Sequence, residues 1–165
     1  MEDKILKRSK TVCYLALVFW GIWALLIIMR LLRFMGIINF NIYLGIDIAP
    51  IVWFDDEAII AQWIELTGYV ITNITMICLV FLFIYKSLKG IKANEVFTHI
   101  NVRILYLMTA TSFFYELFKA NRSILYGNRE VLLDSDPFTT TLIILIVAVF
   151  YKLALCAYEE NRLTI

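Results

Sequence analysis

Four long apolar stretches alternate with shorter polar stretches along the chain. Residues 11–29 and 66–85 carry no charge, residues 104–118 are interrupted only by Glu116, and residues 137–158 only by Lys152. Each stretch approaches the roughly 20 apolar residues that a helix needs to cross a bilayer. The pattern predicts spans at about 11–34, 64–87, 102–120 and 137–158, and therefore an all-α integral membrane four-helix bundle formed by residues 1–165 as one domain.

The alternative is two spans with a buried hairpin, and it is disfavoured because the third and fourth stretches are too apolar to lie in water. Pro137 fits the first turn of the fourth helix, where proline is tolerated. Composition supports the membrane assignment, with 62% hydrophobic residues, 18% charged residues and a mean hydropathy of +0.81. A soluble domain of average composition has about 25% charged residues. The sequence therefore excludes a soluble globular domain.

Basic residues gather on one side of these predicted spans. Because basic residues favour the cytoplasm in short loops, we expect both termini to be cytoplasmic. Ten basic residues fall on the cytoplasmic side of this arrangement and the acidic residues lean to the other side. The ten are Lys4, Lys7, Arg8, Lys10, Lys86, Lys89, Lys92, Arg103, Lys152 and Arg162.

The long extracytoplasmic segment between the first and second helices, residues 36–62, has its own pattern. Apolar and polar residues alternate over 38–44, which predicts a short strand or an extended interfacial piece. Asp55 and Asp56 are expected to cap a helix that leads through Trp63 into the second span. Trp53, Trp63 and Tyr69 fit an interfacial aromatic belt. We favour a packed loop over a ligand-binding cap for this segment.

An embedded carboxylate is the clearest polar feature of the spans. Glu116 shares one helix face with Thr109, Ser112 and Lys119, at spacings of three and four. We expect an intramembrane ion pair formed by Glu116 with an arginine of the first helix, with Lys119 as the local competitor. The candidate set is Glu116, Arg30, Arg33 and Lys119. A structural salt bridge is favoured over a carboxylate that responds to protons or a ligand.

Small and hydroxylated residues form a stripe on the second span. Gly68, Thr72 and Thr75 recur at helical spacing and favour close packing against another helix. No nucleotide, hydrolase or metal-site motif occurs, so we expect no enzyme activity, no cofactor, no metal and no direct binding of nucleic acid. The three cysteines lie within spans, and we expect no disulfide.

Two further motifs resemble a known family. Lys89-Gly90-Ile91-Lys92, followed by Phe97 and Asn101, resembles its inner-loop pattern, and the sequence from Glu159 to Ile165 resembles its closing Leu-Thr-Ile signature. The family comprises small bacterial four-span membrane proteins of unknown function, often encoded beside a small helix-turn-helix regulator. The resemblance implies a bacterial cytoplasmic (inner) membrane protein. It also implies a cytoplasmic docking surface for such a regulator, formed by Lys89, Lys92, Phe97, Asn101, Glu159, Glu160, Leu163, Thr164 and Ile165.

These features together predict a non-enzymatic signalling or interaction protein in contact with the lipid bilayer. The alternatives are a small transporter, a toxin-immunity protein and an accessory subunit of a membrane complex. A transporter is disfavoured because the sequence shows neither repeats nor discontinuous helices.

Overall fold

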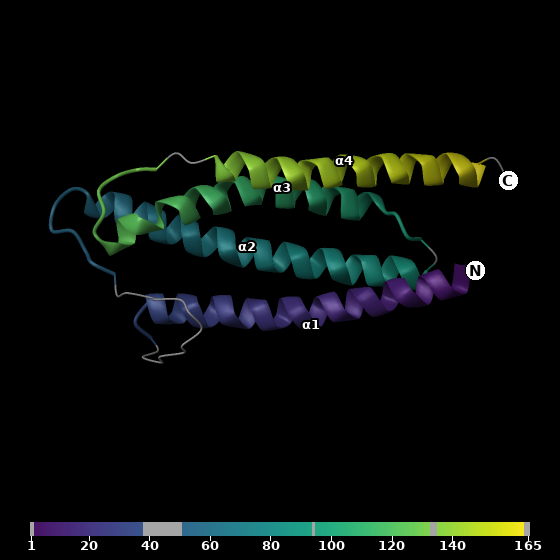
Figure 1. The fold of residues 1–165 in the computed structure, drawn as a ribbon, viewed down its shortest axis with the longest axis horizontal. Helices are drawn as coiled ribbons and strands as arrows, with labels where there is room; N and C mark the ends of the chain where they lie inside the picture. The colour runs from purple at the N-terminus through teal and green to yellow at the C-terminus, as the bar shows by residue number, and fades with distance from the viewer. Residues whose placement is uncertain (1, 38–50, 94, 133–134, 164–165) are drawn as a thin grey trace.

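A computed structural model of the chain describes residues 2–37, 51–93, 95–132 and 135–163. This part contains four α-helices, a short 3₁₀ helix and no strand. The elements are α1 (Glu2–Phe34), α2 (Ile59–Lys92), α3 (His99–Ala120), η1 (Asn121–Tyr126) and α4 (Asp136–Leu163). The four α-helices lie side by side with alternating direction, so both chain ends lie at one end of the molecule (Figure 1). The strand predicted over 38–44 lies outside the described residues.

Three of the helices are long and apolar enough to cross a membrane. They cover Leu6–Arg33, Ile59–Lys92 and Asp136–Asn161, with 28, 34 and 26 residues. At ~1.5 Å per residue each exceeds the ~30 Å hydrocarbon thickness. The 22 residues of α3 are also sufficient in length. However, α3 is not one of the three, because Arg103, Glu116, Lys119 and several hydroxyl side chains lower its apolar character.

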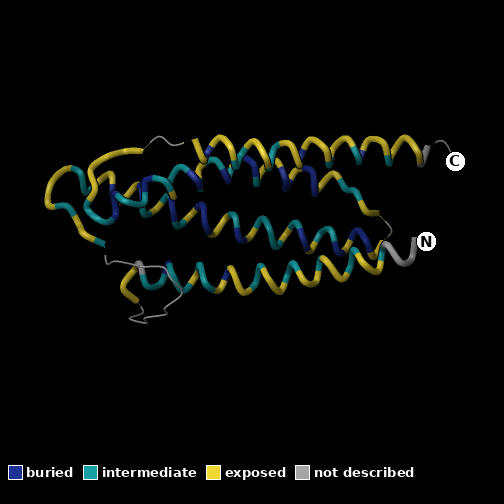
Figure 2. The backbone as a smooth tube through the Cα atoms, viewed as in Figure 1, coloured by how far each residue is buried: buried dark blue, intermediate teal, exposed yellow. Residues whose placement is uncertain are grey.

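The helices pack in the order of the chain. In the described part, the backbone of α1 approaches only that of α2, and the backbone of α4 approaches only that of α3. The buried positions accordingly concentrate in α2, α3 and η1, whereas α1 and α4 are largely exposed (Figure 2). The prediction of a closed four-helix bundle is therefore not confirmed, since closure would bring α1 against α4.

Large apolar side chains cover the outer faces of this array. Phe19 in α1 is 69% exposed and Phe150 in α4 is 66% exposed. A soluble monomer rarely exposes apolar patches of more than a few hundred Å², whereas lipid chains cover such faces without cost. Other exposed residues on the same helices are Val12, Leu15, Val18, Ile22, Trp23, Leu142, Ile143, Ile146, Val147 and Leu153.

The start of α2 differs from the prediction. The helix begins at Ile59, and Ala58 takes the cap position without any side-chain cap bond. Asp56 still accepts a hydrogen bond from the Ala58 N–H at 3.1 Å, but it lies outside the helix and also binds Arg129. The expected cap by Asp55 or Asp56 is therefore wrong. The expected continuity through Trp63 into the second span is confirmed.

The start of α4 agrees with the prediction. Pro137 is the second residue of the helix and its side chain is fully buried. A proline at this position loses no intrahelical bond, because the first N–H groups of a helix have no partner within it.

The small-residue stripe on α2 is only partly an interface. Gly68 lies under the ring of Phe118 from α3, and a Cβ added at Gly68 would clash with that ring. Thr72 is buried and donates to Gly68 O of its own helix at 2.7 Å. Thr75 is exposed and does not join the contact. At Gly68 there is therefore no room for a side chain between α2 and the ring of Phe118.

We predict that Gly68→Val destabilises the folded protein, because the ring of Phe118 must move to admit the new side chain. Overpacking of this kind costs about 1–3 kcal/mol. The free energy of unfolding in detergent micelles is the measurement. Gly21→Val is the matched control, since Gly21 in α1 has no atom within 4 Å of a built Cβ.

The contact between Gly68 and Phe118 is tested by adding Phe118→Leu to the parent protein and to the Gly68→Val variant. The second substitution should reduce the cost of Gly68→Val, giving a coupling free energy between the two sites. Equal losses for Gly68→Val and Gly21→Val, with no coupling, would contradict the close approach.

Candidate functional site at the acidic end

The two ends of the molecule carry opposite charge patterns. The acidic end is defined here as residues 51–58, η1, residues 127–132 and the adjoining turns of α1, α2 and α3. Exposed Asp55, Asp56, Glu57 and Glu130 lie there. The basic end is the opposite one, with both chain ends and the α2–α3 connection (Figure 1). Four buried polar side chains of the described residues, Gln62, Glu65, Glu116 and Asn121, also lie at the acidic end, and they include both buried carboxylates, which makes this end the candidate site.

Gln62 holds the polypeptide of residues 51–54 onto the helices. Its side chain is completely buried, and Nε2 donates to Val52 O at 2.7 Å and to Ile124 O at 3.0 Å. Its Oε1 accepts from Phe54 N at 2.9 Å. Val52 N also donates to Leu125 O of η1 at 3.0 Å. One amide thus joins α2, η1 and the segment before α2, and all of its hydrogen-bonding capacity except one lone pair is used.

Asn121 performs the same task for residues 127–132. Its Nδ2 donates to Leu117 O at 2.9 Å and to Leu132 O at 3.1 Å, and its Oδ1 accepts from Leu132 N at 2.7 Å. The turn that follows η1 uses Gly127 at φ +93°, a left-handed conformation that suits glycine. Buried backbone groups of irregular chain need partners, and these two amide side chains supply them.

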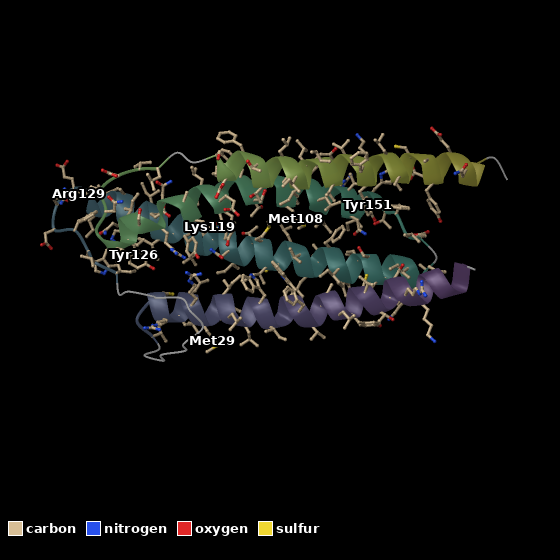
Figure 3. All side chains as sticks on the ribbon, in the orientation of Figure 1. Met29, Met108, Lys119, Tyr126, Arg129 and Tyr151 are labelled. Atoms are coloured by element: carbon tan, nitrogen blue, oxygen red, sulfur yellow. The ribbon has the colours of Figure 1, made fainter. Side chains whose placement is uncertain are left out.

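An exposed ion pair joins the two irregular segments at their tips. Arg129 Nη1 lies 2.8 Å from Asp56 Oδ2, and the guanidinium stacks 4.7 Å from the centre of the Phe54 ring. Figure 3 shows Arg129 at the extreme tip of the acidic end. The hydrogen bond from Arg129 and the Ala58 N–H hold the pKa of Asp56 below its ordinary value. Solvent limits the strength of this pair, because both side chains are at least half exposed.

The embedded carboxylate Glu116 takes its neighbour on the same helix as partner. Lys119 Nζ lies 2.9 Å from Glu116 Oε2, with the carboxylate side chain 10% exposed and the ammonium group half exposed. Among the described residues, Glu116 forms no ion pair with Arg30 or Arg33 of α1. Glu116 pairs with Lys119 rather than with an arginine of α1 because α2 lies between α3 and α1. A spacing of three residues places Lys119 on the same face of α3 as Glu116.

Arg30 nevertheless lies in the same region as this pair. Arg30, Glu116 and Lys119 are all close enough to Tyr115 to act on its hydroxyl electrostatically. The Nε of Arg30 is buried and has no hydrogen-bond partner among the described residues. Tyr115 stacks on Tyr69 of α2 with 6.5 Å between ring centres. Tyr69 is 3% exposed, so the prediction that it belongs to an interfacial aromatic belt is wrong.

Glu65 is the feature of the acidic end that the sequence analysis missed. Its side chain is 5% exposed, and Oε1 has no hydrogen-bond partner in the described part of the chain. It lies three residues after Gln62 and four before Tyr69, on the buried face of α2. That spacing was the available signal, since a carboxylate on the same stripe as two buried positions must also be enclosed. A buried carboxyl group without partners costs stability.

The predicted docking residues lie at the basic end, and the structure does not present all of them at the surface. Asn101 is completely buried, and its Nδ2 donates to Ser87 Oγ at 3.1 Å and to Tyr151 Oη at 3.0 Å. Phe97 packs edge-on to Tyr151 at 5.2 Å between ring centres. Tyr151 lies on α4 toward the basic end (Figure 3). Asn101 therefore connects α2, α3 and α4 and has no side-chain surface to offer.

The remaining docking candidates are more accessible. Lys89, Lys92, Glu159 and Glu160 are exposed. Glu159 Oε1 lies 2.9 Å from His99 Nε2, which joins the end of α4 to the start of α3, a pairing that the sequence did not indicate. Leu163 is the last residue of α4, and Thr164 and Ile165 lie outside the described residues.

No family model, curated protein or solved structure matches this chain.

We predict that Gln62→Leu lowers the free energy of unfolding by about 2 kcal/mol, because it leaves the buried Ile124 carbonyl and the part-buried Val52 carbonyl and Phe54 N–H without their partner. The measurement is thermal or detergent-induced unfolding of the full chain. Asn161→Leu, at an exposed position of α4, is the control and should change little. Similar losses for the two variants would contradict the structural role of Gln62.

We also predict a pH dependence of the contact between Asp56 and Arg129. Because the pKa of Asp56 is lowered in the folded state, the pair stabilises the acidic end above the ordinary pKa of about 3.9. That stabilisation disappears as the pH falls through the lowered pKa. Arg129→Gln should move the Asp56 titration upward, as followed by carboxyl carbon NMR, whereas Arg122→Gln should not. An unchanged midpoint in Arg129→Gln would refute the assignment.

Proposed function

We propose that the chain is a non-enzymatic membrane signalling protein that receives a signal at its acidic end and meets a cytoplasmic partner at its basic end. The observation that carries the proposal is that, among the buried polar atoms without a hydrogen-bond partner in the described chain, Glu65 Oε1 and Arg30 Nε belong to charged side chains at the acidic end. Such groups reduce stability, so folding does not account for them. Intramembrane ionisable groups commonly mark functional sites.

The surroundings of these groups favour a receiving site over a loose loop. Gln62 and Asn121 fix the irregular segments onto the ends of α2 and α3. A fixed cap keeps the enclosed carboxyl and guanidinium groups in constant positions, which is a requirement for selective binding. A polar or charged ligand that satisfies Glu65 or Arg30 would therefore bind with little rearrangement of the cap.

The second part of the proposal concerns transmission to the basic end. One face of α3 carries buried polar residues along its length, from Asn101 through Thr109 and Ser112 to Glu116. Ser112 Oγ lies 3.3 Å from Thr141 Oγ1 of α4, and Asn101 binds Tyr151 of the same helix. A shift of α3 would thus change its contacts with α4 at two positions along the helix. In this way α3 acts as one rigid element that couples the two ends.

The membrane arrangement completes the proposal. The three apolar helices cross the bilayer, and α3 crosses with them as a fourth span, shielded by α2 and α4. The basic end faces the cytoplasm, in accordance with the distribution of lysine and arginine. The partner there is a cytoplasmic helix-turn-helix regulator, contacted through Lys89, Lys92, Glu159 and Glu160, and the setting is a bacterial cytoplasmic membrane.

One observation favours a second candidate, an accessory subunit of a membrane complex. In the described part α1 approaches only α2, which leaves most of its circumference to its surroundings. Another transmembrane protein could occupy that face in place of lipid.

We predict that Glu65→Gln changes amide hydrogen exchange at the basic end, over residues 95–101, by at least about threefold. The reason is that the substitution adds a hydrogen-bond donor at the enclosed site and changes the packing of α2 on α3. The resulting movement of α3 would reach the basic end. Exchange is measured on the full chain in lipid nanodiscs. Glu57→Gln, at an exposed acidic residue of the same end, is the control. A change confined to residues near Glu65 would contradict transmission.

Affinity purification from gently solubilised membranes then separates the two candidates. Recovery of a DNA-binding regulator, reduced by Lys89→Glu with Lys92→Glu, supports the signalling function. Recovery of another membrane protein, insensitive to that double substitution, supports the accessory subunit and overturns the signalling function.

A further inference from the structure

A pocket beside α1 at the basic end is not used by the proposed function. It has a volume of about 550 Å³ and is lined by Lys7, Arg8, Thr11 and Val12. Two cations, a hydroxyl-bearing side chain and an apolar side chain, all on α1, thus line one open recess. We infer that this pocket binds the phosphate-bearing headgroup of an anionic phospholipid.

The cations of the pocket are available for a ligand. The side chains of Lys7 and Arg8 are exposed and form no ion pair or hydrogen bond with the described residues. Lys7 is beyond the first turn of α1, which begins at Glu2. The field of the helix N-terminus falls off within that turn, so the two side chains themselves must supply the attraction. An arginine and a lysine together suit a phosphate, through forked hydrogen bonding and a compact charge.

The position of the pocket along α1 indicates a lipid as the source of that phosphate. The charged stretch of the helix ends at Lys10, and residues 11–29 carry no charge. Val12 and Leu15, immediately beyond the cations, are 63% and 64% exposed. The pocket therefore lies where the polar surface of the helix meets its apolar surface. The headgroup of a lipid lies at that depth when its acyl chains lie along the apolar surface.

Neighbouring helices strengthen the positive potential around the pocket. The start of α1 lies beside the end of α2 (Figure 1), whose last turn carries Lys89 and Lys92. Each basic residue near a membrane surface contributes about a fivefold gain in affinity for anionic lipid. The basic residues of this end would together attract any anionic lipid diffusely. A specific pocket instead predicts that removing Lys7 and Arg8 lowers the affinity for anionic lipid more than removing two other basic residues.

The test is native mass spectrometry of the full chain released from nanodiscs, with phosphatidylglycerol titrated into phosphatidylcholine. We expect Lys7→Gln with Arg8→Gln to weaken phosphatidylglycerol binding at least tenfold. Arg103→Gln with Lys152→Gln removes the same charge from exposed positions that do not line the pocket, and should weaken binding less than threefold. Both double variants should melt like the parent protein, because all four side chains are exposed.

The remaining outcomes decide against the site or its assignment. Equal losses in the two double variants would show diffuse attraction and overturn the pocket. If inorganic phosphate and glycerol phosphate fail to displace the bound phosphatidylglycerol, the result supports a lipid as the occupant. Equal affinity for these soluble phosphates would overturn the lipid assignment. The experiment is independent of the partner and orientation proposed above.

Discussion

The arrangement depends on enclosing the polar face of α3 between α2 and α4. Asn101 and Ser112 on that face are completely buried, and Thr109 and Glu116 are each 8% exposed. In a bilayer these groups can find partners only within the protein. Asn101 meets Ser87 and Tyr151, Ser112 meets Thr141, and Glu116 meets Lys119. The demand for partners therefore places α3 inside, and α2 and α4 follow as its two covers.

The same constraint explains why α1 stands apart. Its described surface is mostly apolar, and Arg30, whose Nε is buried, lies near its acidic-end terminus. Without a polar face that needs enclosure, α1 gains little from contacting a second helix, because lipid chains are as apolar as its own leucines. The helix consequently packs on α2 alone, and the array remains open.

Sequence patterns could predict the helices because their periodicity and length are local properties. The predicted span at 64–87 is part of α2, Pro137 opens α4, and the stripe at Gly68 marks a real interface. Partner choice could not be predicted in the same way. The assignment of Glu116 to Arg30 or Arg33 assumed a bundle in which α1 and α3 touch, whereas α2 separates them. Packing order is a property of the whole chain and left no periodic signal.

The candidate site was only partly predictable for a related reason. Glu116 stood out because it interrupts an apolar run, whereas Glu65 lies just before one and resembles an interfacial charge in sequence. Gln62, three residues earlier on the same face of α2, is covered by η1 and residues 51–54 through its hydrogen bonds. One of those bonds runs to a backbone oxygen 62 residues along the chain, and backbone acceptors carry no residue-type signature. Tyr69 was misplaced at the interface because its ring stacks on Tyr115 of α3, a contact between distant parts of the sequence.

The two ends of the molecule differ in which buried polar atoms lack a hydrogen-bond partner among the described residues. At the basic end Asn101 lacks a partner only for Oδ1, and its amide nitrogen ties three helices together. At the acidic end, equally well-made amide contacts surround a carboxyl oxygen and a guanidinium nitrogen that have none in the described chain. The same end uses all but one lone pair of the Gln62 amide and of the Asn121 amide. The unpaired atoms of Glu65 and Arg30 both belong to ionisable groups, whereas the unpaired atom of Asn101 at the basic end is a neutral amide oxygen, so the two ends differ in the kind of polar group that lacks a partner in the described chain.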